Sequence, residues 1–133
     1  MRGNFLDIPT DCPQRERAGW TGDWQLFLPT AAFLYDVAGF THRWLRDLAA
    51  DQWPDGRVTN HVPDPVGPAG MDNVVASFLT GSAGWGDAAT LVPFEMWRAY
   101  GDDDLLRRQH SSIASRHVFV KPTATSGNSC GRS

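Results

Sequence analysis

The chain has 133 residues, enough for one modest domain with a hydrophobic core. Hydrophobic residues make up 41% and charged residues 20%, which is not the composition of a disordered chain. The net charge of -3 argues against nucleic acid as a partner, because nucleic-acid binding needs a basic face. No segment reaches the roughly 18–20 apolar residues of a membrane span, and the start lacks a secretory signal, so a cytoplasmic chain or a piece of a longer one is expected.

A first helix is predicted over residues 24–37, which are rich in Leu, Phe and Ala. Asp23 is a plausible N-cap for it, and Pro29 should kink the helix or begin its regular part. Residues 37–52 show the clearest helical pattern, because apolar side chains recur at 3–4 spacing and charged ones fill the other face. The apolar positions are Val37, Phe40, Trp44, Leu45 and Leu48.

Residues 53–84 are rich in Pro and Gly and predict a long loop with at most short strands. A loop of this length in a compact domain is usually functional. A third helix is predicted over residues 87–100, with a bend at Pro93 and Gly101 as its C-cap.

A fourth helix should begin at the acidic run 102–104, which favours a helix N-terminus, and extend to about residue 119. Residues 122–133 are rich in Ser, Thr and Gly, and we expect them to be disordered. Helices that alternate with short turns and one long loop predict an all-α fold of stacked helical hairpins.

The most informative segment is residues 11–25, Asp-Cys-Pro-Gln-Arg-Glu-Arg-Ala-Gly-Trp-Thr-Gly-Asp-Trp-Gln. It has neither helical nor strand periodicity and therefore predicts a shaped loop. Its density of carboxylates, arginines and aromatic rings indicates recognition or chemistry. A proton donor, hydrogen-bonding acids and a flat apolar ring suit a site that hydrolyses sugars.

Two interpretations of these acids remain open. Arg15 and Arg17 should lower the pKa of Glu16, whereas Asp11 and Asp23 should raise it. An Arg–Glu ion pair with a purely structural role is the simpler alternative, and the two aspartates could serve an Asx-turn and a helix cap. Their concentration in one loop favours a site.

The segment Trp85-Gly86-Asp87 is a second candidate. Asp87 is either a helix N-cap or a carboxylate that lines the same cavity as the Trp85 ring. Cys12 and Cys130 are expected to be free thiols. No metal or cofactor is expected, because the chain has no phosphate-binding loop and its histidines lack metal-ligand spacing. These histidines are His42, His61, His110 and His117.

Residues 11–23 resemble a motif of the α-L-rhamnosidases of glycoside hydrolase family 78, Asp-Cys-Pro-Gln-Arg-(Asp)-Glu-Arg-x-Gly-Trp-Thr-Gly-Asp, in the form without the bracketed Asp. The likeness covers roughly residues 2–120. It includes Trp44-Leu45-Arg46-Asp47-Leu48, Gln52 with Asp55-Gly56, Val62-Pro63-Asp64, Gly84-Trp85-Gly86-Asp87-Ala88, Pro93-Phe94-Glu95-Met96 and Tyr100-Gly101-Asp102.

This resemblance implies part of an (α/α)6 barrel of the six-hairpin glycosidase type, with four to five helices and the long loop at 53–84. It implies inverting hydrolysis of terminal α-L-rhamnosides, with Glu16 as the general acid. The substrate-binding positions that it implies are Asp11, Arg15, Trp20, Asp23, Trp85 and Asp87.

Residues 1–121 are therefore interpreted as the N-terminal part of a catalytic domain, and residues 122–133 as a tail outside the family pattern. No residue can be assigned as the general base, so we expect a fragment with little or no activity alone. Its uncovered barrel faces should favour self-association. The alternatives are a non-catalytic sugar-binding or interaction module and a different six-hairpin glycosidase.

Overall fold

The computed structural model describes residues 3–67 and 80–125, with side chains described as far as residue 120. The described residues form four helices and no β-strand, apart from three isolated β-bridges, so the predicted all-α fold is confirmed. The helices are α1 (Thr21–Leu34), α2 (Ala38–Asp51), α4 (Ala88–Tyr100) and α5 (Asp103–Thr125).

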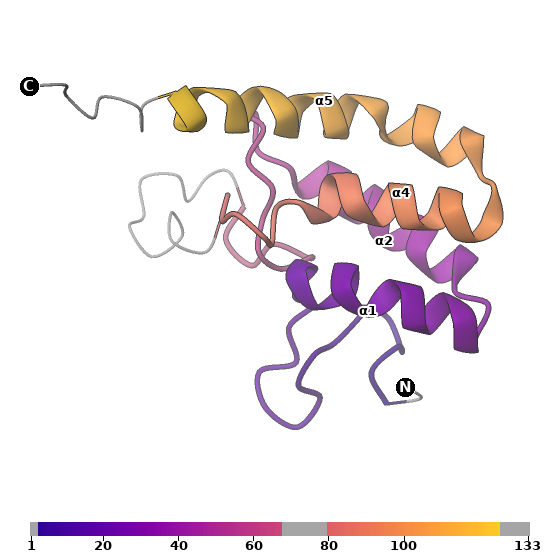
Figure 1. The fold of residues 1–133 in the computed structure, drawn as a ribbon. Helices are drawn as coiled ribbons and strands as arrows, with labels where there is room; N and C mark the ends of the chain where they lie inside the picture. The colour runs from indigo at the N-terminus through magenta and orange to yellow at the C-terminus, as the bar shows by residue number, and fades with distance from the viewer. Residues whose placement is uncertain (1–2, 68–79, 126–133) are drawn as a thin grey trace, which may run out of the picture.

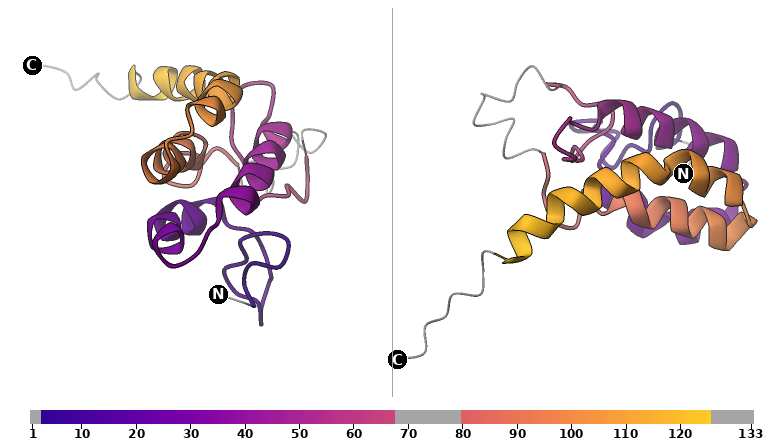
Figure 2. Two further views of the ribbon diagram at one scale, coloured as in Figure 1. Left: turned by 90° about the vertical axis from the view of Figure 1, so that its right-hand side faces the viewer. Right: turned by 90° about the horizontal axis from the view of Figure 1, so that it is seen from above.

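The helices form two hairpins, α1–α2 and α4–α5, each closed by a short turn (Figure 1). Helices α1 and α4 run in the same direction, and α2 and α5 run the opposite way (Figure 1). Helix α4 packs against the other three helices (Figure 2). Both short turns lie at one end of the molecule, and the loops that lead into α1 and α4 lie at the other end, whereas the N-terminal residues run below α1 (Figure 1). The topology therefore brings the loops together.

The core follows from the apolar spacing of the helices. Helix α1 buries Trp24, Leu28 and Ala31, which lie on one face at i, i+4 and i+7. Helix α2 buries Trp44, Leu45 and Leu48, which confirms its predicted pattern. Each of the fully buried leucines, Leu28, Leu45 and Leu48, contributes about 1.5–3 kcal/mol through the hydrophobic effect.

Helix α1 begins earlier than predicted. Its N-cap is Trp20, and Asp23 lies inside the first turn, so the N-cap prediction for Asp23 is wrong. The start is fixed at Thr21, because the backbone N–H of Thr21 donates to the Asn60 carbonyl at 2.9 Å. Asp23 is still well placed, since an acid in the first turn interacts favourably with the helix dipole. Pro29 lies within the helix and does not begin its regular part.

The ends of α4 agree with the sequence. Asp87 is its N-cap residue, although its side chain makes no capping hydrogen bond to the helix. Gly101 is the C-cap, with a left-handed φ of 68° and its N–H bonded to the Trp97 carbonyl at 2.7 Å.

Helix α5 is longer than predicted. It continues to Thr125, so the expected disorder is wrong for residues 122–125, and residues 126–133 with Cys130 lie outside the described residues. Extending an existing helix fixes one residue at a time and avoids the cost of nucleation, which is why a weakly helical sequence can prolong it. Pro122 lies inside this last stretch, where a proline lacks a backbone donor and its ring crowds the carbonyl of the residue four positions earlier, so the helix continues there at a local cost.

The predicted loop is irregular over residues 53–67 and 80–84, and residues 68–79 lie outside the described residues. It is fastened to α5: the Gln52 amide donates to the carbonyls of Gly56 (3.0 Å) and Ser112 (3.2 Å). None of the described helices combines the length and the apolar character that a membrane span requires.

Candidate functional site

The site begins with a loop folded onto the first two helices. The ring of Phe5 contacts those of Trp24 and Phe27 on α1 and of Phe40 on α2, with centroids 5.2, 6.1 and 5.4 Å away. Such aromatic clusters bury a large apolar area. This cluster anchors residues 3–10 to the helices, and thereby fixes the position at which the acid-rich loop from residue 11 begins.

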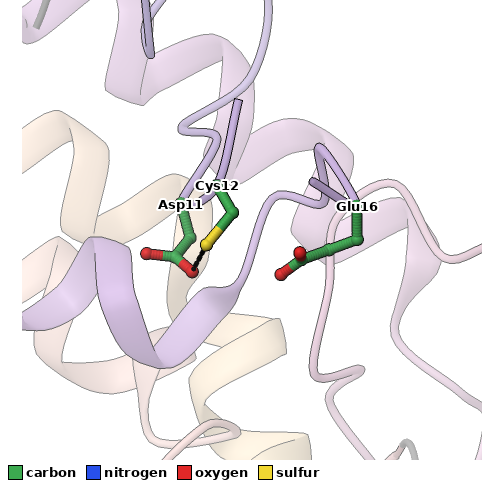
Figure 3. A group of neighbouring side chains, drawn as sticks. All are labelled: Asp11, Cys12 and Glu16. Atoms are coloured by element: carbon green, nitrogen blue, oxygen red, sulfur yellow. Dashed lines mark hydrogen bonds between the residues drawn. The ribbon is translucent and has the colours of Figure 1, made fainter. Parts of the chain in front are cut away.

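A tight turn then brings the acids together. The backbone N–H groups of Arg15 and Arg17 both donate to the Cys12 carbonyl at 3.1 Å, and Arg17 adopts a left-handed φ of 58°. A non-glycine residue in this conformation is uncommon and often marks a functional turn. Figure 3 shows the Glu16 side chain pointing towards Asp11 and Cys12. Ligand atoms of these three side chains lie within 4.8 Å of one another.

Two residues, Arg15 and Trp20, donate hydrogen bonds to Glu16. Arg15 Nε donates to Oε2 at 2.6 Å, and Trp20 Nε1 donates to Oε1 at 3.0 Å. The hydrogen bond from Arg15, above all, lowers the pKa of Glu16 to about 2, with backbone and Trp20 hydrogen bonds adding to it. Of the two opposing effects expected from the sequence, the arginine is the stronger one. In this arrangement Glu16 is ionised at neutral pH and accepts hydrogen bonds.

Asp11 and Asp23 lie beside Glu16. Burial raises the pKa of Asp23, as do the charges of Asp11 and Glu16. Asp11 Oδ2 accepts a hydrogen bond from the Cys12 thiol at 2.9 Å, which raises the pKa of that thiol. Asp11 and Asp23 line a cavity of about 300 Å³ together with aromatic rings. Carboxylates beside apolar rings can bind the hydroxyls and the CH faces of a sugar.

Asp11, Cys12 and Glu16 are near enough to share a cation. Glu16 is already paired with Arg15, however, and the raised pKa keeps the Cys12 thiol protonated at neutral pH. We assign no metal to these residues.

A segment of the long loop completes the surroundings of Trp20. The N–H of Val62 donates to the Gly19 carbonyl at 2.9 Å, and Trp20 forms an antiparallel bridge with His61. A Cβ atom on Gly19 would lie 2.4 Å from the Val62 carbonyl oxygen, so this close approach requires glycine. This contact attaches the loop to the segment that carries Trp20.

Trp85 and Asp87 contact different helices. A Cβ atom on Gly22 would lie 3.1 Å from the Trp85 ring, so this ring packs against the start of α1. Asp87 points towards α5: its Oδ1 accepts from Arg116 Nη2 at 3.1 Å. Among the described residues, Asp87 lines a second cavity of about 360 Å³ with Thr90 and Arg116, separate from that of Asp11 and Asp23.

The structure thus brings five predicted residues together and places Trp85 next to α1 and Asp87 towards α5. The five are Asp11, Arg15, Glu16, Trp20 and Asp23. Sequence reasoning missed His61, which contacts Trp20, and Arg116, which is buried beside Asp87. Arg116 shares a buried face of α5 with Gln109 and Ser112, and polar residues at helical spacing give no hydrophobic signal.

Residues 1–129 match the sequence profile of the bacterial alpha-L-rhamnosidase six-hairpin glycosidase domain. The chain belongs to this family. It is 47% identical over 122 residues to an alpha-L-rhamnosidase of Streptomyces avermitilis, covering 91% of the chain and 11% of that relative. It is 40% identical over 116 residues to one of Alteromonas sp., covering 86% of the chain and 12% of the relative.

Solved rhamnosidases share the fold. The crystal structure of the Streptomyces avermitilis alpha-L-rhamnosidase complexed with L-rhamnose superposes with a TM-score of 0.73 at 42% identity, over 86% of this chain and 10% of that one. The alpha-L-rhamnosidase from Dictyoglumus thermophilum gives 0.78 at 29% identity, over 92% and 13%. These matches confirm the family resemblance and the partial six-hairpin barrel. The chain spans about a tenth of the length of these relatives.

Proposed function

We propose that this chain supplies the general acid and part of the sugar-binding residues of an α-L-rhamnosidase active site. Residues 1–121 are then the N-terminal part of its catalytic domain. The observation that carries the proposal is the convergence of Asp11, Glu16 and Asp23 on one end of the helices. The substrates are glycosides with terminal L-rhamnose. This chemistry involves neither nucleic acid nor a membrane surface and needs no cofactor.

Glu16 acts as the general acid in this proposal and protonates the leaving oxygen. Asp11, Arg15 and Asp23 bind sugar hydroxyls. A general acid needs a raised pKa, whereas the contact with Arg15 keeps the pKa of Glu16 at about 2. The proposal therefore requires that bound sugar draws Arg15 away from Glu16 and excludes water from it. Trp20, Trp85 and Asp87 contribute the surrounding rings and a further acceptor.

A general base is the missing component. An inverting enzyme needs a second carboxylate roughly 6.5–9.5 Å from the acid, with a water between them. A carboxylate oxygen of Asp11 lies within 4.8 Å of one of Glu16, which leaves too little room for that water, so Asp11 is not the general base. We assign no general base within the described residues and expect little or no turnover by this chain alone.

A thermal melt of the purified chain tests the proposal. Six tryptophans report its thermal melt by fluorescence, and L-rhamnose should raise the midpoint, since a ligand that binds only the native state stabilises it. Asp23→Asn should abolish the rise, whereas Glu95→Gln should preserve it, because Glu95 pairs with Arg98 on α4. A midpoint that L-rhamnose leaves unchanged would contradict the proposal.

A second candidate function is sugar binding without catalysis. The low pKa of Glu16 favours it, because an ionised carboxylate accepts hydrogen bonds but donates no proton. Release of nitrophenol from an aryl α-L-rhamnoside, abolished by Glu16→Gln, would exclude this candidate. The same melt is repeated with other sugars in place of L-rhamnose. A midpoint raised by another sugar but not by L-rhamnose would indicate a different six-hairpin glycosidase.

We further propose that the chain self-associates through its uncovered apolar side chains. Leu26 and Phe33 on α1 are 79% and 87% exposed, and Phe94 and Trp97 on α4 are exposed as well. Helices α1 and α4 are neighbours, so these residues lie on adjoining elements. Large exposed apolar areas of this kind mark association surfaces.

A further inference from the structure

The Trp20 indole contacts the imidazole ring of His61. The centroids of Trp20 and His61 are 4.2 Å apart, with the ring planes tilted by 55°. The indole also donates its N–H to Glu16 Oε1 at 3.0 Å. Trp20 therefore connects His61, from the long loop, with the carboxylate proposed as the general acid.

The segment that carries His61 is fixed on several sides. The Thr59 hydroxyl donates to the His61 carbonyl at 2.6 Å. The Trp53 indole donates to Asp64 Oδ2 at 3.0 Å, and the Asp64 N–H donates to Asp51 Oδ2 at 2.7 Å. Such a segment offers His61 as a rigid support, whereas the loop around Glu16 is exposed.

We propose that His61 is a positioning residue for Glu16 and acts through the ring of Trp20. This inference rests on the proposed function, since it concerns the same carboxylate. A half-exposed indole without a neighbouring ring has several staggered rotamers available. Contact with His61 selects the rotamer that aims the N–H at Glu16, and Arg15 holds the second carboxylate oxygen.

The contact between the rings does not depend on a charged imidazole. Burial lowers the pKa of His61, although the charges of Asp64 and Glu16 oppose this, so the imidazole is neutral at pH 7. The other charged groups around Glu16 are Arg15 and the carboxylates of Asp11 and Asp23. A flat ring of any chemistry should therefore replace His61.

The test measures coupling between Trp20 and Glu16 at pH 7 in the full chain. In ¹⁵N–¹H spectra, the Trp20 indole resonance is assigned with Trp20→Phe. Glu16→Gln should shift it, because the acceptor loses its charge. The same shift should appear in the His61→Phe background and disappear in the His61→Ala background. His61→Leu, which keeps apolar volume without a ring, should behave like His61→Ala if the latter fails to fold.

Two results would overturn the inference. One is a full response to Glu16→Gln in both His61→Ala and His61→Leu, which would mean that no ring support is needed. The other is a lost response in His61→Phe, which would assign the effect to imidazole polarity. The melt with L-rhamnose is measured on the same variants. A wild-type midpoint unmoved by L-rhamnose contradicts the proposed function, while the indole response decides the positioning role separately.

Discussion

At the scale of single residues, the ionisation of Glu16 depends on Arg15. We predict that Arg15→Ala raises the pKa of Glu16 from about 2 towards the ordinary 4.5, since the largest cause of the shift is removed. Selective ¹³C labelling of glutamate yields only two carboxyl resonances, Glu16 and Glu95, and the latter serves as an internal control. An unchanged Glu16 titration in Arg15→Ala would contradict the assigned cause.

The same shift makes stability depend on pH. The folded state lowers the pKa of Glu16, so its contribution is fully present above the unfolded value of about 4.5 and is lost as the pH falls towards 2. We predict that Glu16→Gln reduces the loss of thermal midpoint between pH 5 and pH 3. Melts of the wild type, Glu16→Gln and Glu95→Gln across this range give the comparison, and equal slopes for all three would refute it.

The thiol of Cys12 provides a separate probe of Asp11. Because Asp11 accepts its hydrogen bond and raises its pKa, we expect slow alkylation by iodoacetamide at pH 8. Asp11→Ala should accelerate the reaction several-fold. Both chains carry Cys130→Ser so that one thiol is followed. Equal rates would show that Asp11 does not control the thiol.

At the scale of elements, the long loop is attached to α5 at Gly56. Its φ is +92°, and an added Cβ would lie 2.2 Å from the Ser115 carbonyl oxygen. Gly101 has a φ of +68° but no described atom within 4 Å of such a Cβ. Gly101→Ala should thus cost about 1 kcal/mol from backbone strain alone. Gly56→Ala should cost about 1–3 kcal/mol more, because the backbone must also shift.

Urea unfolding of both glycine variants measures this difference. A matching loss of stability would mean that the loop moves away from α5 freely. A larger loss at Gly56 would show that the loop and the helix form one cooperative unit.

The local pattern of apolar and glycine residues in the sequence was sufficient to predict the helices. The 3–4 spacing around Trp44 and the glycine at position 101 depend on neighbours in sequence, and both predictions are confirmed. The N-cap of α1 could not be predicted, because it is fixed by Asn60, far along the chain. Likewise, the loop motif identified Glu16 and its neighbours, but the ring of His61 reaches Trp20 only through the tertiary fold.

At the scale of the whole molecule, the uncovered faces of α1 and α4 should control solubility. We predict that the wild type sediments as oligomers at micromolar concentration and that Leu26→Ser with Phe33→Ser shifts it towards the monomer. Val118→Ser, on α5 and 66% exposed, is the matched control and should have a smaller effect. Sedimentation velocity measures all three, and a monomeric wild type would contradict the prediction.

The hydrogen bonds between residues 19–21 and 60–62 also bear on how the chain folds. They join positions about 40 residues apart, so closing this loop is opposed by chain entropy, and the helical turns nearby involve no such closure. The acid-bearing loop should consequently become ordered after the α1–α2 hairpin, as one of the last events of folding. Its amides should then exchange with solvent through small openings that leave the helices intact. A ligand for this end of the molecule would therefore bind a region that is folded, yet costs little to open.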